Sequence, residues 1–293
     1  MKKWFGAVRW NIVMLMRRPG AALAVIFLLV VSLAAIFADL LPLDPLRQRV
    51  VNALMPPNPN NWFGTDELGR DILARTVYGA RTSLITAAGA VLIAASVGVP
   101  IGLVAGFFGG WRDAVLMRFI DVLLSLPAIL LAMAIIAVLG RSQLAALIAV
   151  GITGIPNFAR ITRAQVLALR KRDFVTAVEA FGGSSSYIMF RTILPNSWSP
   201  ILVQVVVLSS VAILIEAGLA FLGIGVPPPT PTWGAMLGEG KNYLHEAPYY
   251  AVLPGVVLTL TILSFDTIGR ALSSQIEDRS DTGAGVTRQE TAP

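Results

Sequence analysis

The sequence predicts an all-α, polytopic membrane protein with six transmembrane helices and both termini in the cytoplasm. Of its 293 residues, 55% are hydrophobic and only 14% are charged. A single soluble core cannot bury so large an apolar share, so the surplus must face lipid. The apolar residues also fall in long, continuous runs without the alternation of barrel strands, which favours membrane-spanning helices.

Six charge-free runs are long enough for the roughly 20 residues that cross a bilayer core. They cover residues 21–38, 82–111, 122–140, 142–159, 192–215 and 247–265, and the fifth is expected to continue to Leu222. The first run resembles a signal peptide because Lys2 and Lys3 precede it, but it is longer than the usual apolar region of about 7–15 residues. We therefore predict a retained helix. Small residues in the second run, among them Gly102, would let a neighbouring helix approach closely.

The basic residues predict the orientation. With the amino terminus inside, 16 of the 23 Lys and Arg residues fall in cytoplasmic segments, as expected for an inner-membrane protein. The net charge of +6 therefore reflects topology, and no nucleic-acid partner is expected.

Most catalytic chemistry is excluded. The chain has no cysteine and one histidine, His245, so no metal site and no cofactor are expected. The segment 238–242 resembles a phosphate-binding loop, but Ala235 and Asn242 replace its first glycine and its Ser or Thr. Without such a loop the chain is not an enzyme that hydrolyses ATP, and any ATPase must be a separate subunit.

The runs divide the chain into a cytoplasmic tail (1–20), the first helix with an outer loop (21–81), a core (82–272) and a flexible cytoplasmic tail (273–293), with disorder expected after Asp278. The outer loop contains a charge cluster, which either contacts an extracytoplasmic partner or pairs internally; internal pairing is favoured by its alternating signs. This cluster consists of Asp66, Glu67, Arg70 and Asp71.

The cytoplasmic loop 160–200 is much longer than a helix connection requires. An apolar stripe at i, i+3, i+4 and i+7 begins at Phe174 and predicts a short helix, with Asp173 as its N-cap and Gly182 as its stop. Ser184 is expected to cap a second short helix that ends before Pro195. Because the stripe must be covered by the membrane surface or by a partner's groove, and the helix is barely two turns long, we favour a protein partner.

The loop and three further segments resemble one family. Gly182, Leu194 and Pro195 have the spacing of the cytoplasmic EAA loop of binding-protein-dependent ABC importer permeases, with Thr176 in place of its Glu. Residues 64–71, 78–84 and 221–237 are similar to signatures of the C-type subunit of dipeptide, oligopeptide and nickel importers. This resemblance covers about residues 17–278 and implies the type I permease fold of ABC importers.

The resemblance also implies partners and a site. A second homologous permease would enclose the pathway, two ABC ATPase subunits would bind the loop, and an extracytoplasmic substrate-binding protein would deliver dipeptides, oligopeptides, a nickel chelate or another small solute. The ATPase-coupling residues would be Asp173, Phe174, Ala177, Val178, Phe181, Gly182, Leu194 and Pro195. An ion-coupled secondary carrier is the alternative from another class, and it should show inverted repeats and paired acidic residues at mid-membrane.

Three acidic residues lie in or near the apolar runs. Glu216, toward the outer end of the fifth run, is interpreted either as a pathway residue or as a structural carboxylate, with equal weight. Neither a catalytic partner for it nor an inverted repeat is apparent, which disfavours an intramembrane enzyme and a carrier. Asp121 and Asp266 are expected to pair with Arg118 and Arg270.

Overall fold

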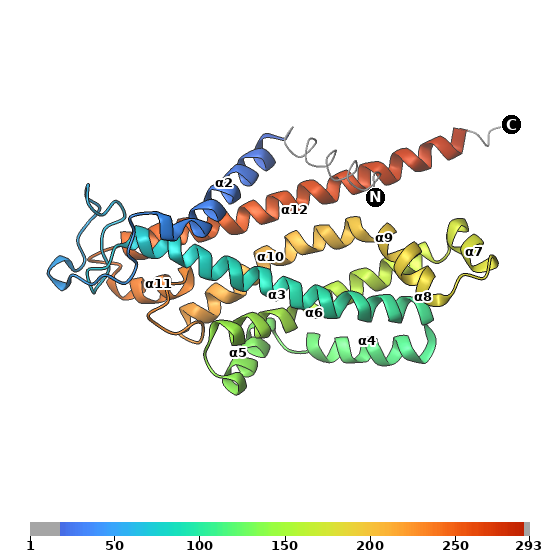
Figure 1. The fold of residues 1–293 in the computed structure, drawn as a ribbon, viewed down its shortest axis with the longest axis horizontal. Coiled ribbons are helices and arrows are strands. Elements are labelled where there is room, and N and C mark those ends of the chain that lie inside the picture. The colour runs from blue at the N-terminus through green and yellow to red at the C-terminus, as the bar shows by residue number, and fades with distance from the viewer. Residues whose placement is uncertain (1–17, 290–293) are drawn as a thin grey trace.

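A computed structural model describes the backbone of residues 18–289 and the side chains of residues 18–274. The described backbone is a bundle of long helices (Figure 1), and its only β-pairing is two isolated bridges, Asn58–Asn61 and Thr65–Asp71. The predicted all-α class is therefore confirmed.

Five helices are long and apolar enough to cross a membrane, and they agree with five of the six predicted runs. Asp71 begins the helix that starts at Ile72, because its carboxylate accepts hydrogen bonds from the backbone N–H groups of Leu73 and Ala74 at 2.7 and 3.1 Å. The five helices are α2 (Pro19–Ile36), α3 (Ile72–Phe108), α6 (Gln143–Leu169), α10 (Trp198–Phe221) and α12 (Tyr249–Gln289).

The third predicted span is not one straight helix. Helix α4 (Gly110–Leu124) and helix α5 (Ala128–Leu139) meet at an angle of 89°, and together they are long and apolar enough to form a sixth, bent span. The Ser125 hydroxyl donates to the Val122 carbonyl at 2.7 Å, and Pro127 has no N–H to continue the helix. Pro127 is the N-cap of α5 and stands at the break between the two helices.

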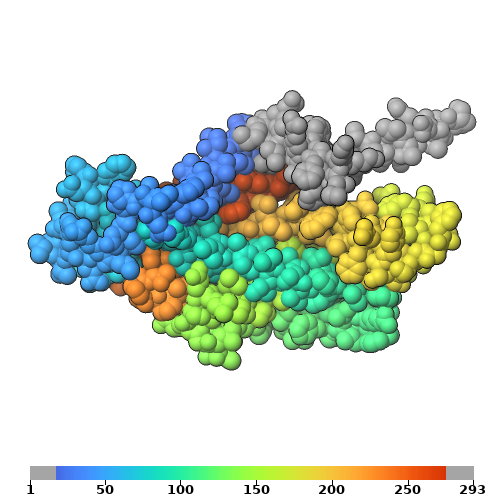
Figure 2. Space-filling view, viewed as in Figure 1, coloured from blue at the N-terminus to red at the C-terminus, as the bar shows by residue number. Residues whose placement is uncertain are grey.

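Connecting segments gather at the two ends of the bundle (Figure 1). One end carries residues 37–71, with the short turns η1 (Ala38–Leu40) and η2 (Val50–Asn52), together with α11 (Trp233–Gly240) and η4 (Lys241–Tyr243). The loop 37–71 projects from this end in the space-filling view (Figure 2). The charge distribution predicts that this end is extracytoplasmic.

The opposite end carries α7 (Asp173–Ala180), α8 (Ser185–Tyr187), the π-helix η3 (Ile188–Ile193) and α9 (Leu194–Asn196). The second short helix was expected to end before Pro195, but helical turns continue without a break through Asn196. Pro195 lies in the first turn of α9, where a missing N–H is tolerated. The carboxyl end of α12 lies at this end too (Figure 1) and remains helical to Gln289, past Arg279, where composition predicted disorder.

Helices α3 and α6 pack along most of their length. Gly98, Gly102 and Gly106, spaced four residues apart, form one face of α3. A Cβ on Gly98 would lie 2.6 Å from the Ile155 carbonyl oxygen, and one on Gly106 would lie 2.8 Å from Val166 Cβ. The absence of side chains therefore sets the distance between the two backbones, as the small residues predicted.

A buried cluster of ion pairs holds the loop 37–71 against α3 and α11. The Asp66 carboxylate accepts from Arg70 Nε at 2.6 Å and from Arg75 Nη1 at 2.9 Å. Arg75 Nη2 also reaches Glu239 Oε2 on α11 at 3.0 Å, and that oxygen accepts from the Tyr250 hydroxyl at 2.8 Å. Asp66, Arg70 and Arg75 are nearly inaccessible, so the predicted internal pairing is confirmed for Asp66 and Arg70.

The loop between α6 and α10 as a candidate functional site

Helix α7 is attached to the bundle by one side. Val175 is buried and Val178 half-buried, and both pack against a small core at the α7 end of the molecule. This core joins α3, α6 and the π-helix, and it consists of Leu103, Phe107, Val166, Leu169, Ile188, Met189 and Ile193. The short helix is therefore held by tertiary packing, which a helix of eight residues needs.

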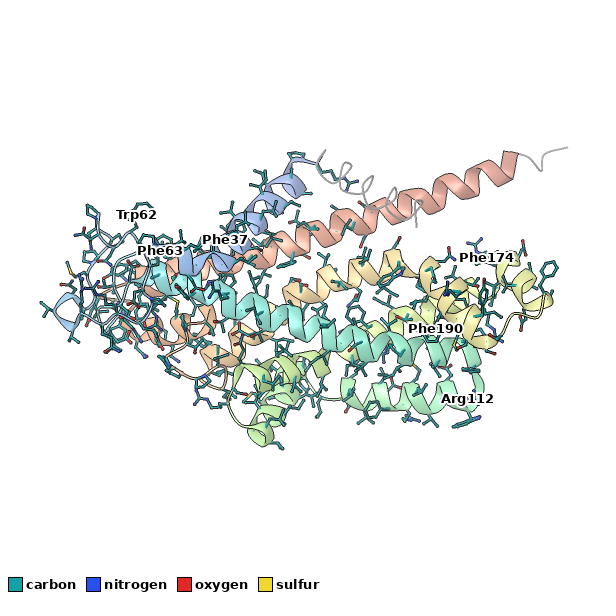
Figure 3. The ribbon with its side chains drawn as sticks, in the orientation of Figure 1. Phe37, Trp62, Phe63, Arg112, Phe174 and Phe190 are labelled. Carbon is teal, nitrogen blue, oxygen red and sulfur yellow. The ribbon has the colours of Figure 1, made fainter. Side chains whose placement is uncertain are left out.

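The other side of α7 is uncovered. Phe174 is 43% exposed, Ala177 is exposed, and the Phe181 ring at the end of the helix is 92% exposed. Figure 3 shows Phe174 at the extremity of the bundle. The predicted stripe thus divides: Phe174, Ala177 and Phe181 face outward, while Val178 faces the protein.

The amino-terminal cap differs from the prediction. Arg172, in an extended conformation, is the N-cap, and its carbonyl accepts from the backbone N–H of Val175 at 2.9 Å and of Thr176 at 3.2 Å. Asp173 is instead the first helical residue. Its carboxylate still lies in the first turn, where the helix dipole favours negative charge.

The carboxyl end of α7 is a glycine stop, as predicted. Gly182 has φ +80°, its N–H donates to the Glu179 carbonyl at 3.0 Å, and the Gly183 N–H donates to the Val178 carbonyl at 2.9 Å. These two bonds form a Schellman motif, which requires a left-handed residue at Gly182. The turn directs the chain away from α7 directly after the exposed Phe181 ring.

Polar contacts tie the base of the loop to the neighbouring helices. The Arg170 guanidinium donates to the Phe107 carbonyl and lies 5.0 Å from the centre of the Phe107 ring. Arg163 on α6 makes two hydrogen bonds of 2.6 Å to Asp113 on α4, a bidentate geometry that fixes orientation. These contacts join the base of the loop to α3 and α4.

The remaining loop residues follow the chain toward α10. Ser184 caps α8 as predicted, because its hydroxyl accepts from the Tyr187 N–H at 3.3 Å. Leu194 is half-buried and packs against the central core, while Pro195 is exposed. Leu194 and Pro195 thus link the loop to the bundle and lie apart from the exposed face of α7.

Glu216 lies apart from this loop, in the half of α10 that approaches α11. Its carboxylate is buried, and Oε2 accepts from the Ser83 hydroxyl on α3 at 2.9 Å. Oε1 has no hydrogen-bond partner within the described residues. The site residues predicted from the sequence therefore fall in two separate places.

The ion pair predicted for Asp266 is present, whereas the one predicted for Asp121 is not. Asp266 pairs with Arg270 at 2.6 Å, as predicted. Asp121 pairs with Arg160 of α6 at 2.7 Å and not with Arg118. The pairing within α4 was wrong because a cation on the adjacent helix lies closer. No group of three or more acidic or histidine residues in the described part of the chain could hold a metal ion.

Sequence reasoning missed Val175 and Arg170, which anchor the loop. Val175 and Val178 stand three residues apart, so an inward apolar pair was visible beside the outward stripe. The Arg170 contact joins residues that are distant in sequence, and it had no local signal.

The chain is similar to known membrane transport proteins over most of its length. The dipeptide transport system permease protein DppC of Alkalihalophilus pseudofirmus is 41% identical over 88% of this chain and 86% of its own length. The glutathione transport system permease protein GsiD of Escherichia coli is 39% identical, over 90% and 88%. A crystal structure of an amino acid ABC transporter superposes with a TM-score of 0.54 at 17% identity, covering 71% of this chain and 94% of that one, which supports the fold.

The family model for binding-protein-dependent transport system inner membrane components matches residues 98–278. That match includes the loop between α6 and α10, and the relatives above are permease subunits and not enzymes. Together with the apolar helices, these findings identify a multi-pass protein of the inner membrane. The chain belongs to the family of binding-protein-dependent transport system inner membrane components and is a membrane subunit of an ABC importer.

Proposed function

We propose that this chain forms, with a second homologous permease, the path by which peptides cross the membrane, and that α7 couples this path to ATP hydrolysis by two separate ATPase subunits. An extracytoplasmic binding protein delivers the peptide. The names of the relatives, which include dipeptide and glutathione permeases, support a peptide as substrate.

The observation that carries the coupling role is the two-sided character of α7. Its outward ring, Phe181, is almost fully exposed, whereas Val175 on the inward side is buried. An exposed aromatic ring on a well-anchored helix is typical of a contact with a partner protein. A groove on the ATPase that accepts Phe174 and Phe181 would grip the helix, and the small core behind Val175 would carry the movement into the bundle.

The contacts of the loop make such a transfer direct. Arg170 connects the end of α6 to the end of α3, and Arg163 connects α6 to α4. Leu194 then leads into α10. A displacement of α7 on nucleotide binding would thus reach four helices of the bundle without crossing a mobile linker.

Reconstitution tests the proposal. The permease pair, the ATPases and the binding protein would be placed in proteoliposomes, and uptake of a labelled dipeptide would be measured with and without ATP. We expect uptake only when the ATPases and ATP are both present. Uptake driven by a proton gradient without the ATPases would instead establish the ion-coupled carrier.

A nickel chelate is the alternative substrate. The same proteoliposomes distinguish it, because saturating nickel chelate would then compete with dipeptide uptake. We expect no competition, because the named relatives transport dipeptides and glutathione.

A further inference from the structure

The uncovered surface of helix α4 is apolar along one edge and polar along the other. In the space-filling view α4 lies along the edge of the molecule (Figure 2), and side chains project from it away from α3 (Figure 3). On one face Trp111, Val115, Phe119 and Val122 follow one another at intervals of three or four residues, and each is more than half exposed. This face has the composition of a surface in contact with lipid chains.

The uncovered surface of α4 becomes polar on the side of α6, where Asp121 bonds to Arg160. Arg118, Asp121 and Ser125 are all exposed. Arg118 and Ser125 stand seven and fourteen residues after Trp111, so they border the apolar stripe, and Asp121 lies farther round the helix. Because successive helical residues are rotated by about 100°, Asp121 points well away from Phe119. The helix therefore shows charge and apolar surface to solvent at the same level along its axis.

Helix α6 continues the polar face. Asn157 and Arg160 are exposed and three residues apart, and Arg160 Nη2 donates to Asp121 Oδ1 at 2.7 Å. This ion pair joins the two helices, yet about half of each side chain remains uncovered, at 56% for Arg160 and 51% for Asp121. Within residues 18–274, the side chains of Arg118 and Asn157 make neither a hydrogen bond nor an ion pair.

One environment cannot satisfy both edges of this surface, Asp121 on one side and Phe119 on the other. A helix surrounded by lipid would not leave a half-exposed ion pair beside an unpaired arginine. A helix surrounded by water would not expose a continuous apolar stripe of this length. Helix α4 must therefore stand at a border, with lipid on one side and an aqueous space on the other.

We infer that the polar surface formed by Arg118, Asp121, Ser125, Asn157 and Arg160 lines the aqueous path between the two permease subunits. The inference rests on the proposed function, because the second subunit encloses the path. A surface with an open ion pair and an additional cation suits a zwitterionic solute such as a short peptide, since both charged termini find a counter-charge there.

Cysteine labelling tests this assignment directly, because the chain contains no cysteine of its own. Ser125→Cys and Asn157→Cys place a thiol on the polar surface, and Val115→Cys and Phe119→Cys are matched controls on the apolar face. The assembled transporter in lipid nanodiscs would be treated with a positively charged, membrane-impermeant methanethiosulfonate, without nucleotide and with a non-hydrolysable ATP analogue. Labelling of this chain would be quantified after separation of the subunits.

We expect labelling at Ser125→Cys and Asn157→Cys at least tenfold faster than at both controls in one or both nucleotide states. Equal rates on the two faces, or no labelling of the polar face in either state, would overturn the inference and indicate a dry contact with the second subunit. ATP hydrolysis stimulated by binding protein and peptide would be measured in the same nanodiscs. If ATP hydrolysis is stimulated normally but the polar surface is not labelled, this inference alone is refuted. If binding protein and peptide do not stimulate ATP hydrolysis in the cysteine-free protein, the result counts against the proposed function.

Discussion

The Ser83 hydroxyl on α3 donates a hydrogen bond of 2.9 Å to the buried Glu216 carboxylate on α10. This contact joins two helices that are far apart in sequence, and Glu216 is 1% exposed. A buried polar group stabilises a fold only while its partner is present. The bond therefore makes Glu216 a structural link between α3 and α10, whatever contact the second carboxylate oxygen makes in the assembled transporter.

Two replacements of Glu216 distinguish the contribution of its hydrogen-bond acceptor from that of its negative charge. Glu216→Gln keeps an oxygen that can accept from Ser83, so we expect a thermal unfolding midpoint close to that of the parent. Glu216→Ala leaves the Ser83 hydroxyl unsatisfied and opens a cavity, which should destabilise the protein by about 2–4 kcal/mol. Unfolding of the purified subunit in detergent measures both. Equal loss in the two variants would show that the hydrogen bond is not what Glu216 contributes.

Phe181→Asp is expected to leave the protein in the membrane, because the ring makes no buried contact. The charge should prevent docking in an apolar groove and uncouple ATP hydrolysis from uptake. Membrane content, ATPase activity and dipeptide uptake in proteoliposomes measure these effects. Phe181→Leu is the matched control and should retain most uptake. Normal uptake by Phe181→Asp would remove the docking role of α7.

Gly102→Val should force α3 and α6 apart, because a Cβ at this position would collide with the Ala159 carbonyl. Overpacking of this kind typically costs about 1–3 kcal/mol. Gly20→Ala is a suitable comparison, since no atom lies within 4 Å of its added Cβ, and its stability should be unchanged or slightly raised. Thermal unfolding of both variants tests the expectation, and equal midpoints would disprove close packing at Gly102.

Arg75→Gln should be strongly destabilising because it leaves the Asp66 carboxylate with one cation fewer in a buried site. Breaking a buried pair from one side costs about 3–5 kcal/mol. Glu67→Gln changes a more exposed member of the same cluster and should cost less than about 1 kcal/mol. Limited proteolysis of the loop 37–71 would report the difference, and equal resistance in both variants would contradict it.

The apolar runs predicted the long helices well because a span is a local property of composition. Residues 142–159, for example, lie almost wholly within α6, and α10 covers 198–221 of the predicted run 192–222. The run 122–140 falls in the bent pair α4 and α5, and hydropathy could not predict the bend because it measures how apolar a segment is and not its direction. Pro127 was visible, but whether a proline bends a helix slightly or separates two helices by 89° depends on the packing around it.

The candidate site was predicted in part for a similar reason. Phe174, Ala177 and Phe181 are exposed as the spacing predicted, since one face of a short helix can be derived from periodicity. Val178 faces inward because α7 is apolar on two sides, and only the position of the small core decides which side is buried. The Asp121–Arg160 pair also depends on how α4 lies against α6, a relation between helices that one sequence does not specify.

The glycine face of α3 determines how far a movement at the loop can extend. Since Gly98, Gly102 and Gly106 press the two backbones together, α3 and α6 are expected to tilt as one rigid body. Helix α3 has 37 residues and is about 55 Å long at 1.5 Å per residue. A tilt of about 10° imposed beside α7 would then displace the far end by about 10 Å, which is comparable to the diameter of a helix with its side chains.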